Sequence, residues 1–204
     1  MEDDDNFDIL IKLVILGSTG VGKSNYLYRF VDGEFNPVHV ATIGFDFKSR
    51  ICEISKLEKK VKFQIWDTAG QERYMSINKN LFQRVHGIIL MYDITSEDSF
   101  NDLDTWMKHI KENSKGSPVI LIGNKSDLIN ERKVSKEQGE TYAKNNNLIF
   151  FEASGKSGEN VQESFFNLGE IIIKSEKFLE NKDKSKNEYI VSKSTSKKTK
   201  KKCC

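Results

Sequence analysis

The stretch "ILIKLVILGSTGVGKS" (residues 9–24) decides the fold. Residues 9–16 form a short, almost wholly apolar run rich in β-branched side chains, which predicts a strand buried on both faces at the centre of a parallel sheet. Residues 17–24, "GSTGVGKS", fit the spacing G-x-x-x-x-G-K-[S/T] of a loop that binds phosphate and leads into a helix. The stretch therefore predicts an α/β protein with a phosphate site after its first strand.

Further segments with strand character follow. Residues 45–54 and 61–66 are joined by a short polar link, and the alternation of apolar and polar residues in 61–66 predicts one wet face. We expect these two strands to form an antiparallel hairpin. Three apolar runs, at 87–94, 118–124 and 148–152, come later in the chain and predict parallel strands.

Helices separate the later strands. Apolar residues recur at helical spacing over residues 99–113. Ser135 with Gln138, and Asn160 with Glu163, predict capping boxes at the starts of two further helices. Alternating strands and helices predict a three-layer α/β fold, with a six-stranded, mostly parallel sheet, one antiparallel edge strand and helices on both faces.

Composition and charge limit the class of protein. At 204 residues the chain is long enough for one well-packed domain. Residues 181–204 hold nine lysines and two acids, a charge of +7, which leaves −5 for residues 1–180. The acidic body argues against nucleic acid as a partner, whereas the basic tail suits an anionic surface. Cys52 is the only cysteine before residue 203, so we expect no disulfide framework and a reducing compartment.

The phosphate loop supplies the first group of candidate site residues. Its glycines let successive backbone N–H groups point into one concavity, Lys23 adds a positive charge for the β- and γ-phosphates, and the Ser24 hydroxyl suits Mg²⁺. The positive end of the following helix favours an anion. The predicted nucleotide-binding residues here are Gly17, Ser18, Thr19, Gly20, Val21, Gly22, Lys23 and Ser24.

The motif "GNKSD" (123–127) indicates which base is bound. Guanine presents two adjacent donors, N1–H and the 2-amino group, which the Asp127 carboxylate can accept together. Against adenine the same carboxylate would remain unpaired, and such a mismatch discriminates strongly. We expect Asn124 and Lys125 to brace the loop and cover the base.

The motif "WDTAGQE" (66–72) indicates hydrolytic chemistry. Asp67 suits a direct or water-mediated contact to Mg²⁺, and the Gly70 N–H can approach the γ-phosphate. Gln71 can orient a water molecule for in-line attack, which makes it the predicted catalytic residue.

These motifs together resemble those of the Ras-like small GTPases and, within them, the Rab proteins of membrane traffic. The resemblance covers roughly residues 8–180 and the final cysteines, and the motifs stand in family order. They are "GSTGVGKS", "TIGFDFK" (42–48), "WDTAGQERY" (66–74), "GNKSD" and "EASGKSG" (152–158). The resemblance implies the small G-protein version of the P-loop NTPase fold.

The resemblance also implies further roles. Thr42 would give its hydroxyl to Mg²⁺ beside Ser24 and Asp67, and Phe35 would lie against the guanine face unless it is an ordinary hydrophobic anchor. Ser154, Gly155 and Lys156 would close over the base, with a backbone N–H near guanine O6. Residues 33–44 and 67–84 would be switch segments. The implied effector region is His39, Val40, Ala41, Thr42, Ile43, Gly44, Phe45, Asp46 and Phe47.

Four features depart from the family pattern. Gly155 replaces the usual alanine, which predicts a looser backbone and weaker nucleotide retention. His39 stands where the family has a ring that covers the phosphates, and Thr19 lies where it often has a small residue. The stretch "LFQRV" (81–85) replaces a Tyr-Tyr-Arg-Gly-Ala sequence, so partner choice there cannot be inherited by analogy.

The implied activity is that of a molecular switch, which hydrolyses GTP to GDP and phosphate with GTP/GDP and Mg²⁺ as cofactors. No arginine in the sequence suggests a finger in cis, so we expect slow intrinsic hydrolysis, on the order of 10⁻⁴–10⁻³ per second, that depends on a GTPase-activating protein. The alternative is a nucleotide-bound membrane adaptor with negligible hydrolysis. A phosphoryl-transferring kinase would need a second substrate site and an arginine-bearing lid, and the sequence suggests neither.

The C-terminal tail predicts a membrane anchor. The Rab resemblance implies two geranylgeranyl groups on Cys203 and Cys204, which would supply the two signals that stable anchoring needs. Lysines add about 1 kcal/mol each near an anionic leaflet. The alternative is an unmodified, solvated tail with two reactive thiols. We therefore expect an acidic extension at 1–7, a GTP-binding domain at 8–180 and a disordered basic tail at 181–204. The resemblance implies a monomer on the cytoplasmic face of membranes, with a cytosolic pool. Implied partners are an exchange factor, a GTPase-activating protein, effectors, the prenylation machinery and a GDP-dissociation inhibitor.

Overall fold

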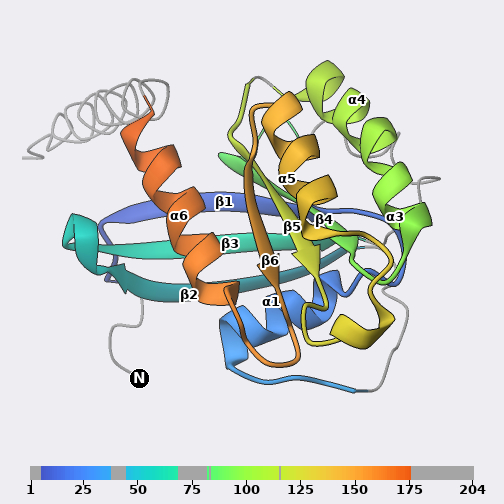
Figure 1. Cartoon of the computed structure of the whole chain (residues 1–204). Coiled ribbons are helices and arrows are strands. Elements are labelled where there is room, and N and C mark those ends of the chain that lie inside the picture. Colours follow the sequence, from blue (N-terminus) through green and yellow to red (C-terminus); the bar gives the residue numbers. More distant parts are fainter. Residues whose placement is uncertain (1–5, 38–44, 69–81, 83, 115, 176–204) are drawn as a thin grey trace, which may run out of the picture.

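A six-stranded sheet forms the centre of the computed structural model, which describes residues 6–37, 45–68, 82, 84–114 and 116–175 (Figure 1). The strand order is β2-β3-β1-β4-β5-β6. The strands are β1 (Ile9–Leu16), β2 (Phe45–Ile54), β3 (Lys59–Thr68), β4 (Gly87–Asp93), β5 (Val119–Asn124) and β6 (Ile149–Ala153).

The sheet is parallel except at one edge. β1 pairs in parallel with β3 and β4, and the parallel pairing continues through β5 to β6. β2 pairs antiparallel with β3, with Phe45 opposite Thr68 and Ile54 opposite Lys59, across the short helix η1 (Ser55–Leu57). The predicted fold class, including its antiparallel edge strand, is confirmed.

Helices cover both faces of the sheet (Figure 1). α1 and α6 contribute apolar side chains to one core cluster, and α4 and α5 contribute to a second. Central strands β1 and β4 feed both clusters, because successive side chains point to opposite faces. The helices are α1 (Lys23–Asp32), α3 (Glu97–Asn101), α4 (Leu103–Asn113), η3 (Ile129–Glu131), α5 (Lys136–Asn145) and α6 (Val161–Lys174).

Two helix predictions are corrected in detail. The helical pattern over 99–113 corresponds to two helices, α3 and α4, which a turn at Asp102 separates. The capping box of Ser135 and Gln138 is confirmed at the start of α5. The one predicted for Asn160 and Glu163 is wrong, because Asn160 has φ 54° and its side-chain amide donates to the Glu152 carbonyl (2.7 Å) instead of capping α6.

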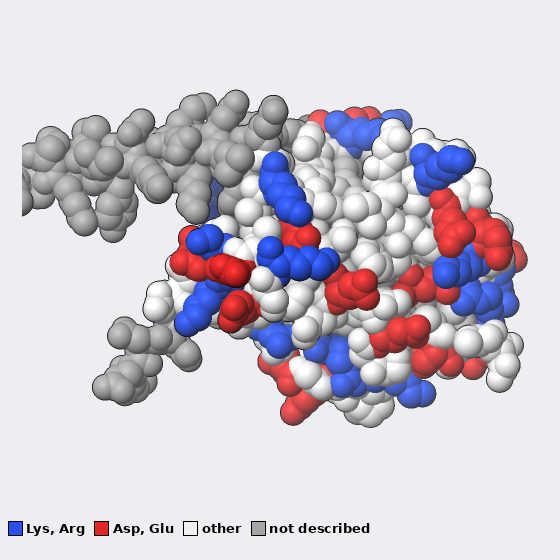
Figure 2. Space-filling view, turned by 60° about the vertical axis from the view of Figure 1, so that its left-hand side comes forward, with Lys and Arg blue, Asp and Glu red and all other residues white. Residues whose placement is uncertain are grey.

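Charged side chains of both signs are interspersed over the face in Figure 2. None of the helices that the structure describes is both long and apolar enough to cross a bilayer.

Candidate nucleotide-binding site

The predicted phosphate and base motifs meet at one edge of the sheet. The phosphate loop follows β1, Asp67 lies near the end of β3, and the base motif begins at the end of β5. Residues 154–156 follow β6. Because the carboxyl ends of parallel strands share one edge, segments far apart in sequence converge there, as in other open α/β sheets.

Two glycines let the phosphate loop lie close to its neighbours. Gly17 has φ 140°, and a Cβ there would lie 2.2 Å from the Met91 carbonyl oxygen on β4. Gly22 has φ 93°, and a Cβ there would lie 2.5 Å from Asn124 Nδ2. Each position excludes a side chain both by its conformation and by its surroundings, and α1 begins directly after Gly22.

The Lys23 ammonium lies inside the loop that it follows. Only 6% of the residue is exposed, and Nζ donates to the carbonyls of Gly17 (2.8 Å) and Ser18 (2.9 Å). Burial lowers the pKa of Lys23 to about 8, although the nearby Asp67 carboxylate acts in the opposite direction. A cation is thus held where phosphate would enter.

Ser24 and Asp67 place two oxygen ligands side by side. The Ser24 hydroxyl donates to Asp67 Oδ2, and Asp67 is 1% exposed. A hydroxyl and a carboxylate are hard oxygen donors of the kind that Mg²⁺ takes alongside phosphate oxygens. The described residues therefore fit the predicted metal, while Thr42, the third predicted ligand, lies outside them.

Asn124 connects the phosphate loop to the base loop. Its Nδ2 donates to the Val21 carbonyl at 2.8 Å, and its Oδ1 accepts from the Gly155 N–H at 3.2 Å. Asn124 is 2% exposed, so both hydrogen bonds are shielded from water. One buried side chain therefore links the two loops.

The Asp127 carboxylate is oriented from the opposite loop. The Ser154 hydroxyl donates to Oδ1 at 2.5 Å, and Lys156 Nζ lies 3.8 Å from Oδ2. Ser154 is fully buried, and its oxygen also accepts the N–H groups of Lys156 (3.1 Å) and Ser157 (2.9 Å). The fixed hydroxyl therefore sets the direction in which the carboxylate points.

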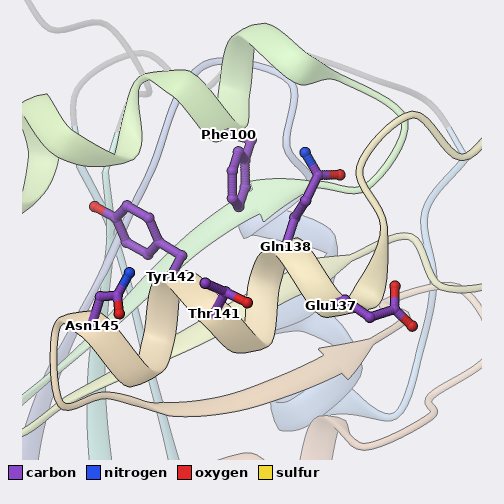
Figure 3. A pocket seen from close by; sticks show the side chains of 6 residues that line it. All are labelled: Phe100, Glu137, Gln138, Thr141, Tyr142 and Asn145. Atoms are coloured by element: carbon purple, nitrogen blue, oxygen red, sulfur yellow. The ribbon is translucent and has the colours of Figure 1, made fainter.

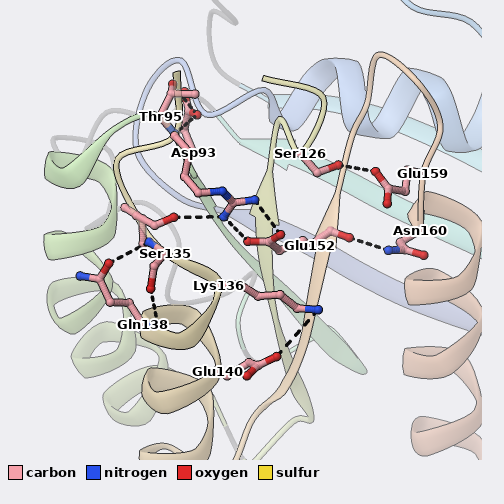
Figure 4. A network of polar contacts seen from close by, with 12 residues as sticks. Asp93, Thr95, Ser126, Ser135, Lys136, Gln138, Glu140, Glu152, Glu159 and Asn160 are labelled. Carbon is pink, nitrogen blue, oxygen red and sulfur yellow. Dashed lines mark hydrogen bonds and ion pairs between the residues drawn. The ribbon is translucent and has the colours of Figure 1, made fainter. Parts of the chain in front are cut away.

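The segments that carry the two base motifs are also joined by side-chain contacts (Figure 4). The Ser126 hydroxyl donates to Glu159 at 2.6 Å. Arg132 forms a bidentate ion pair with Glu152 on β6, with hydrogen bonds of 2.6 and 2.9 Å. Ser126 and Glu152 belong to the "GNKSD" and "EASGKSG" motifs, and Glu159 and Arg132 follow them in the chain, so the two motifs are held together.

Asp93 and Thr95 are polar neighbours of the site that belong to none of the sequence motifs. Lys125, at φ 67°, places Nζ 2.6 Å from Asp93 Oδ2. Asp93 Oδ1 accepts from both the N–H and the hydroxyl of Thr95, each at 2.8 Å. The available signal in the sequence was an acid at the end of an apolar run, and the sheet places Asp93 directly opposite Asn124.

A second contact that the sequence did not indicate joins the phosphate loop to α4. The Ser18 hydroxyl donates to Asp102 Oδ2 at 2.6 Å, and Trp106 Nε1 donates to the Ser18 hydroxyl at 3.4 Å. Asp102 is the residue at the turn between α3 and α4, so the break between these two helices lies directly beside the phosphate loop.

The switch predictions lie largely outside the described residues, which include neither 38–44 nor 69–81. Thr42, Gly70, Gln71 and His39 fall in these gaps. Phe35 is half-buried, and the N–H of its neighbour Asn36 donates to Asn25 on α1. Phe35 is thus held close to α1.

Two described parts of the predicted partner surfaces differ in exposure. In the effector region, Phe47 on β2 is 48% exposed, and its ring lies 5.3 Å from that of Trp66. In the atypical stretch 81–85, Phe82 and Val85 are buried in the core. These two apolar side chains therefore pack in the core of the domain.

A separate hollow of about 370 Å³ lies between α3 and α5 (Figure 3). Phe100 of α3 lies on one side of it, and Gln138 and Tyr142 of α5 lie on the other. None of the predicted nucleotide-binding residues lines it. The remaining lining residues are Glu137, Thr141 and Asn145.

Comparison with known proteins shows the family of the chain. The Ras family model matches residues 12–174. Ras-related protein Rab-13 from Rattus norvegicus is 46% identical over 168 residues, which cover 82% of each chain. The Bos taurus and Mesocricetus auratus Rab-13 proteins are 46% and 47% identical over 171 residues, or 83% of each chain.

A P-loop sheet with guanine-type base loops at its carboxyl edge defines the class of small GTPases. The chain belongs to the Ras family and, within it, to the Rab proteins, switches that hydrolyse GTP and regulate membrane traffic.

The lowered pKa of Lys23 predicts a pH dependence of stability. Below pH 8 Lys23 is protonated in both the folded and the unfolded chain. Between pH 8 and the ordinary pKa of 10.5 it stays protonated in the unfolded chain but loses its proton in the folded one. The free energy of unfolding therefore rises with pH over this range. Urea unfolding of the nucleotide-free chain should show a gain of about 2 kcal/mol between pH 8 and 10, relative to Lys23→Met. If the free energy of unfolding changed with pH in the same way in both proteins, the lowered pKa would be contradicted.

Proposed function

We propose that GTP binds across the carboxyl edge of the sheet, with its phosphates in the loop 17–24 and its base between the loops at 124–127 and 154–156. The observation that carries this proposal is the Asn124 side chain, which holds the Val21 carbonyl and the Gly155 N–H at once. A single ligand could then span both loops.

In this arrangement the Asp127 carboxylate selects guanine. Ser154 holds the carboxylate in position, so that its oxygens can accept from the two adjacent donors of guanine. Lys125, held by Asp93, covers the base with its stem. Adenine lacks both of these donors, so Asp127 would lose its hydrogen bonds to the base, which disfavours ATP.

Ser24, Asp67 and Thr42 would hold Mg²⁺, which when bound neutralises charge on the phosphates. The adjacency of Ser24 and buried Asp67 supports this assignment. Lys23 would exchange the carbonyls of Gly17 and Ser18 for phosphate oxygens, and the ammonium would stay in a water-poor site. There a charge-assisted hydrogen bond is strong.

Gln71 would orient the attacking water, and the Gly70 N–H would contact the γ-phosphate. Intrinsic turnover should be slow, and a GTPase-activating protein would accelerate it. Effectors would bind the surface near Phe47 and Trp66 when GTP orders the switch segments, and an exchange factor would reload the site.

The proposed role of Gln71 predicts a defect confined to the chemical step. Single-turnover hydrolysis of Mg²⁺-GTP should be on the order of 10⁻⁴–10⁻³ per second in the wild type, and at least about tenfold slower in Gln71→Leu. Affinity for GTP should stay unchanged, because leucine removes only the group that orients water. Phosphate release from preloaded protein provides the measurement.

The same assay decides the second candidate function, a nucleotide-bound adaptor. Its motivation is the set of departures from the family pattern, namely Thr19, His39, Gly155 and the stretch "LFQRV" (81–85). Tight GTP binding with no turnover in either protein, even with a GTPase-activating protein present, would favour the adaptor.

We further propose that geranylgeranyl groups on Cys203 and Cys204 anchor the chain to the cytoplasmic face of membranes. The lysine-rich segment before them supports this, because lysines attract an anionic leaflet. Prenylation machinery would attach the groups, and a GDP-dissociation inhibitor would maintain a cytosolic pool.

Replacing both cysteines with serine should move the protein wholly into the soluble fraction of cells. A single chain binds membranes only weakly, with K of about 10⁴ M⁻¹, so each single replacement should give partial release. Fractionation followed by blotting measures the distribution. The Cys52→Ser variant is the matched control and should stay on membranes; membrane retention of the double variant would contradict the anchor.

A further inference from the structure

The Arg29 guanidinium holds three backbone carbonyls that belong to two separate segments. Arg29 Nε donates to Gly155 (3.0 Å) and Nη2 donates to Lys156 (2.6 Å), both in the base loop. Nη1 donates to Gly33 (2.6 Å), which ends α1 and begins the segment that carries Phe35. One side chain therefore connects the two walls proposed to flank the base.

The shape of the side chain matters for this contact. Arginine presents five N–H donors in a rigid planar fork, so it can hold acceptors on different segments at once. A lysine at the same place would keep the positive charge, which also favours the C-terminal end of a helix such as α1, but it has no fork. A comparison of arginine with lysine at this position therefore distinguishes the effect of hydrogen-bond geometry from that of charge.

Gly155 lets the base loop lie close to α1, where its carbonyl meets Arg29. A Cβ on Gly155 would lie 3.1 Å from the Tyr26 nitrogen and 3.2 Å from the Asn25 carbonyl carbon, so the loop lies directly on the first turns of α1. The Gly155 N–H donates to Asn124, and its carbonyl accepts from Arg29. The glycine, expected to loosen the loop, is thus pinned at both of its polar groups.

We propose that Arg29 is a positioning residue that retains the nucleotide by clasping the base loop, residues 154–156, to the segment from Gly33 to Phe35. This inference rests on the proposed guanine pocket. Loss of the clasp frees both walls of the pocket and speeds release. The phosphate side of the site is untouched, so hydrolysis of GTP that is already bound keeps its rate.

The test measures release of a fluorescent GDP analogue from the whole chain with Mg²⁺ present, after addition of excess GTP. Release from Arg29→Ala should be about tenfold faster than from the wild type, as expected for loss of charge-assisted hydrogen bonds. Arg29→Lys should release nearly as fast as Arg29→Ala. Arg50→Ala is the matched control, because Arg50 also donates to an α1 carbonyl, that of Phe30, and it should release at the wild-type rate.

Hydrogen exchange of the GDP-loaded proteins separates the clasp from a general loss of stability. In Arg29→Ala, exchange should rise in residues 153–158 and 33–37 and stay unchanged in α4. Release at the wild-type rate from Arg29→Lys would assign the effect to charge alone, and a rise throughout the chain would assign it to the fold. Either result overturns the clasp.

A further variant tests the pocket on which the clasp rests. Asp127→Asn replaces an acceptor with an amide donor and should shift preference from GDP toward xanthosine diphosphate, whose 2-oxo group accepts a hydrogen bond. Without that shift the proposed pocket fails, and the clasp fails with it. With the shift, but with unchanged release from Arg29→Ala, only the clasp fails.

Discussion

The buried side-chain amide of Asn124 is the contact on which the site depends. It joins a carbonyl of the phosphate loop to an N–H of the base loop, and water does not compete because the residue is 2% exposed. The sheet makes this contact possible, since parallel strands β1, β5 and β6 deliver the three loops to one edge. The parallel sheet brings these loops to one edge, and the Asn124 amide joins two of them by hydrogen bonds. Together they explain how segments distant in the sequence form one nucleotide site.

Charge burial is the second constraint on the site. Lys23 is enclosed with a lowered pKa, and Asp67 is almost fully buried beside Ser24. Isolated buried charges are costly, and here the lysine interacts with two loop carbonyls and with the Asp67 carboxylate. The same arrangement prepares Lys23 for phosphate, because a poorly hydrated ammonium loses little water when a ligand replaces its carbonyl partners. Burial of the charged Lys23 lowers the free energy of unfolding, and in return it keeps a cation available for phosphate.

Local patterns predicted the architecture well, for identifiable physical reasons. Residues 9–16 and 87–94 are continuous apolar runs because their strands are buried on both faces, and such runs can be read directly. Ser135 formed its predicted capping box with Gln138, whereas Asn160 turned its amide to the Glu152 carbonyl on β6. The second prediction failed because a tertiary partner outcompeted a local one, which sequence spacing does not encode.

The same limit explains which site residues the sequence did not indicate. Asp93, Asp102 and Arg29 belong to no motif, and each acts through a contact with a loop distant in the chain. Motif residues such as Lys23 and Asn124 were found because their spacing follows from the chemistry of phosphate and base. Supporting residues have no fixed spacing, since they depend on which loops the sheet brings together.

Hydrogen exchange of the GDP-loaded chain with Asn124→Ala tests the central claim most directly. The account predicts that exchange rises in both residues 17–24 and residues 153–158, because the lost amide held both loops. Asn113→Ala, which removes an amide that donates to the His109 carbonyl within α4, should leave both loops unchanged. Faster exchange in one loop alone, or in neither, would contradict the claim that Asn124 joins the two loops into one site.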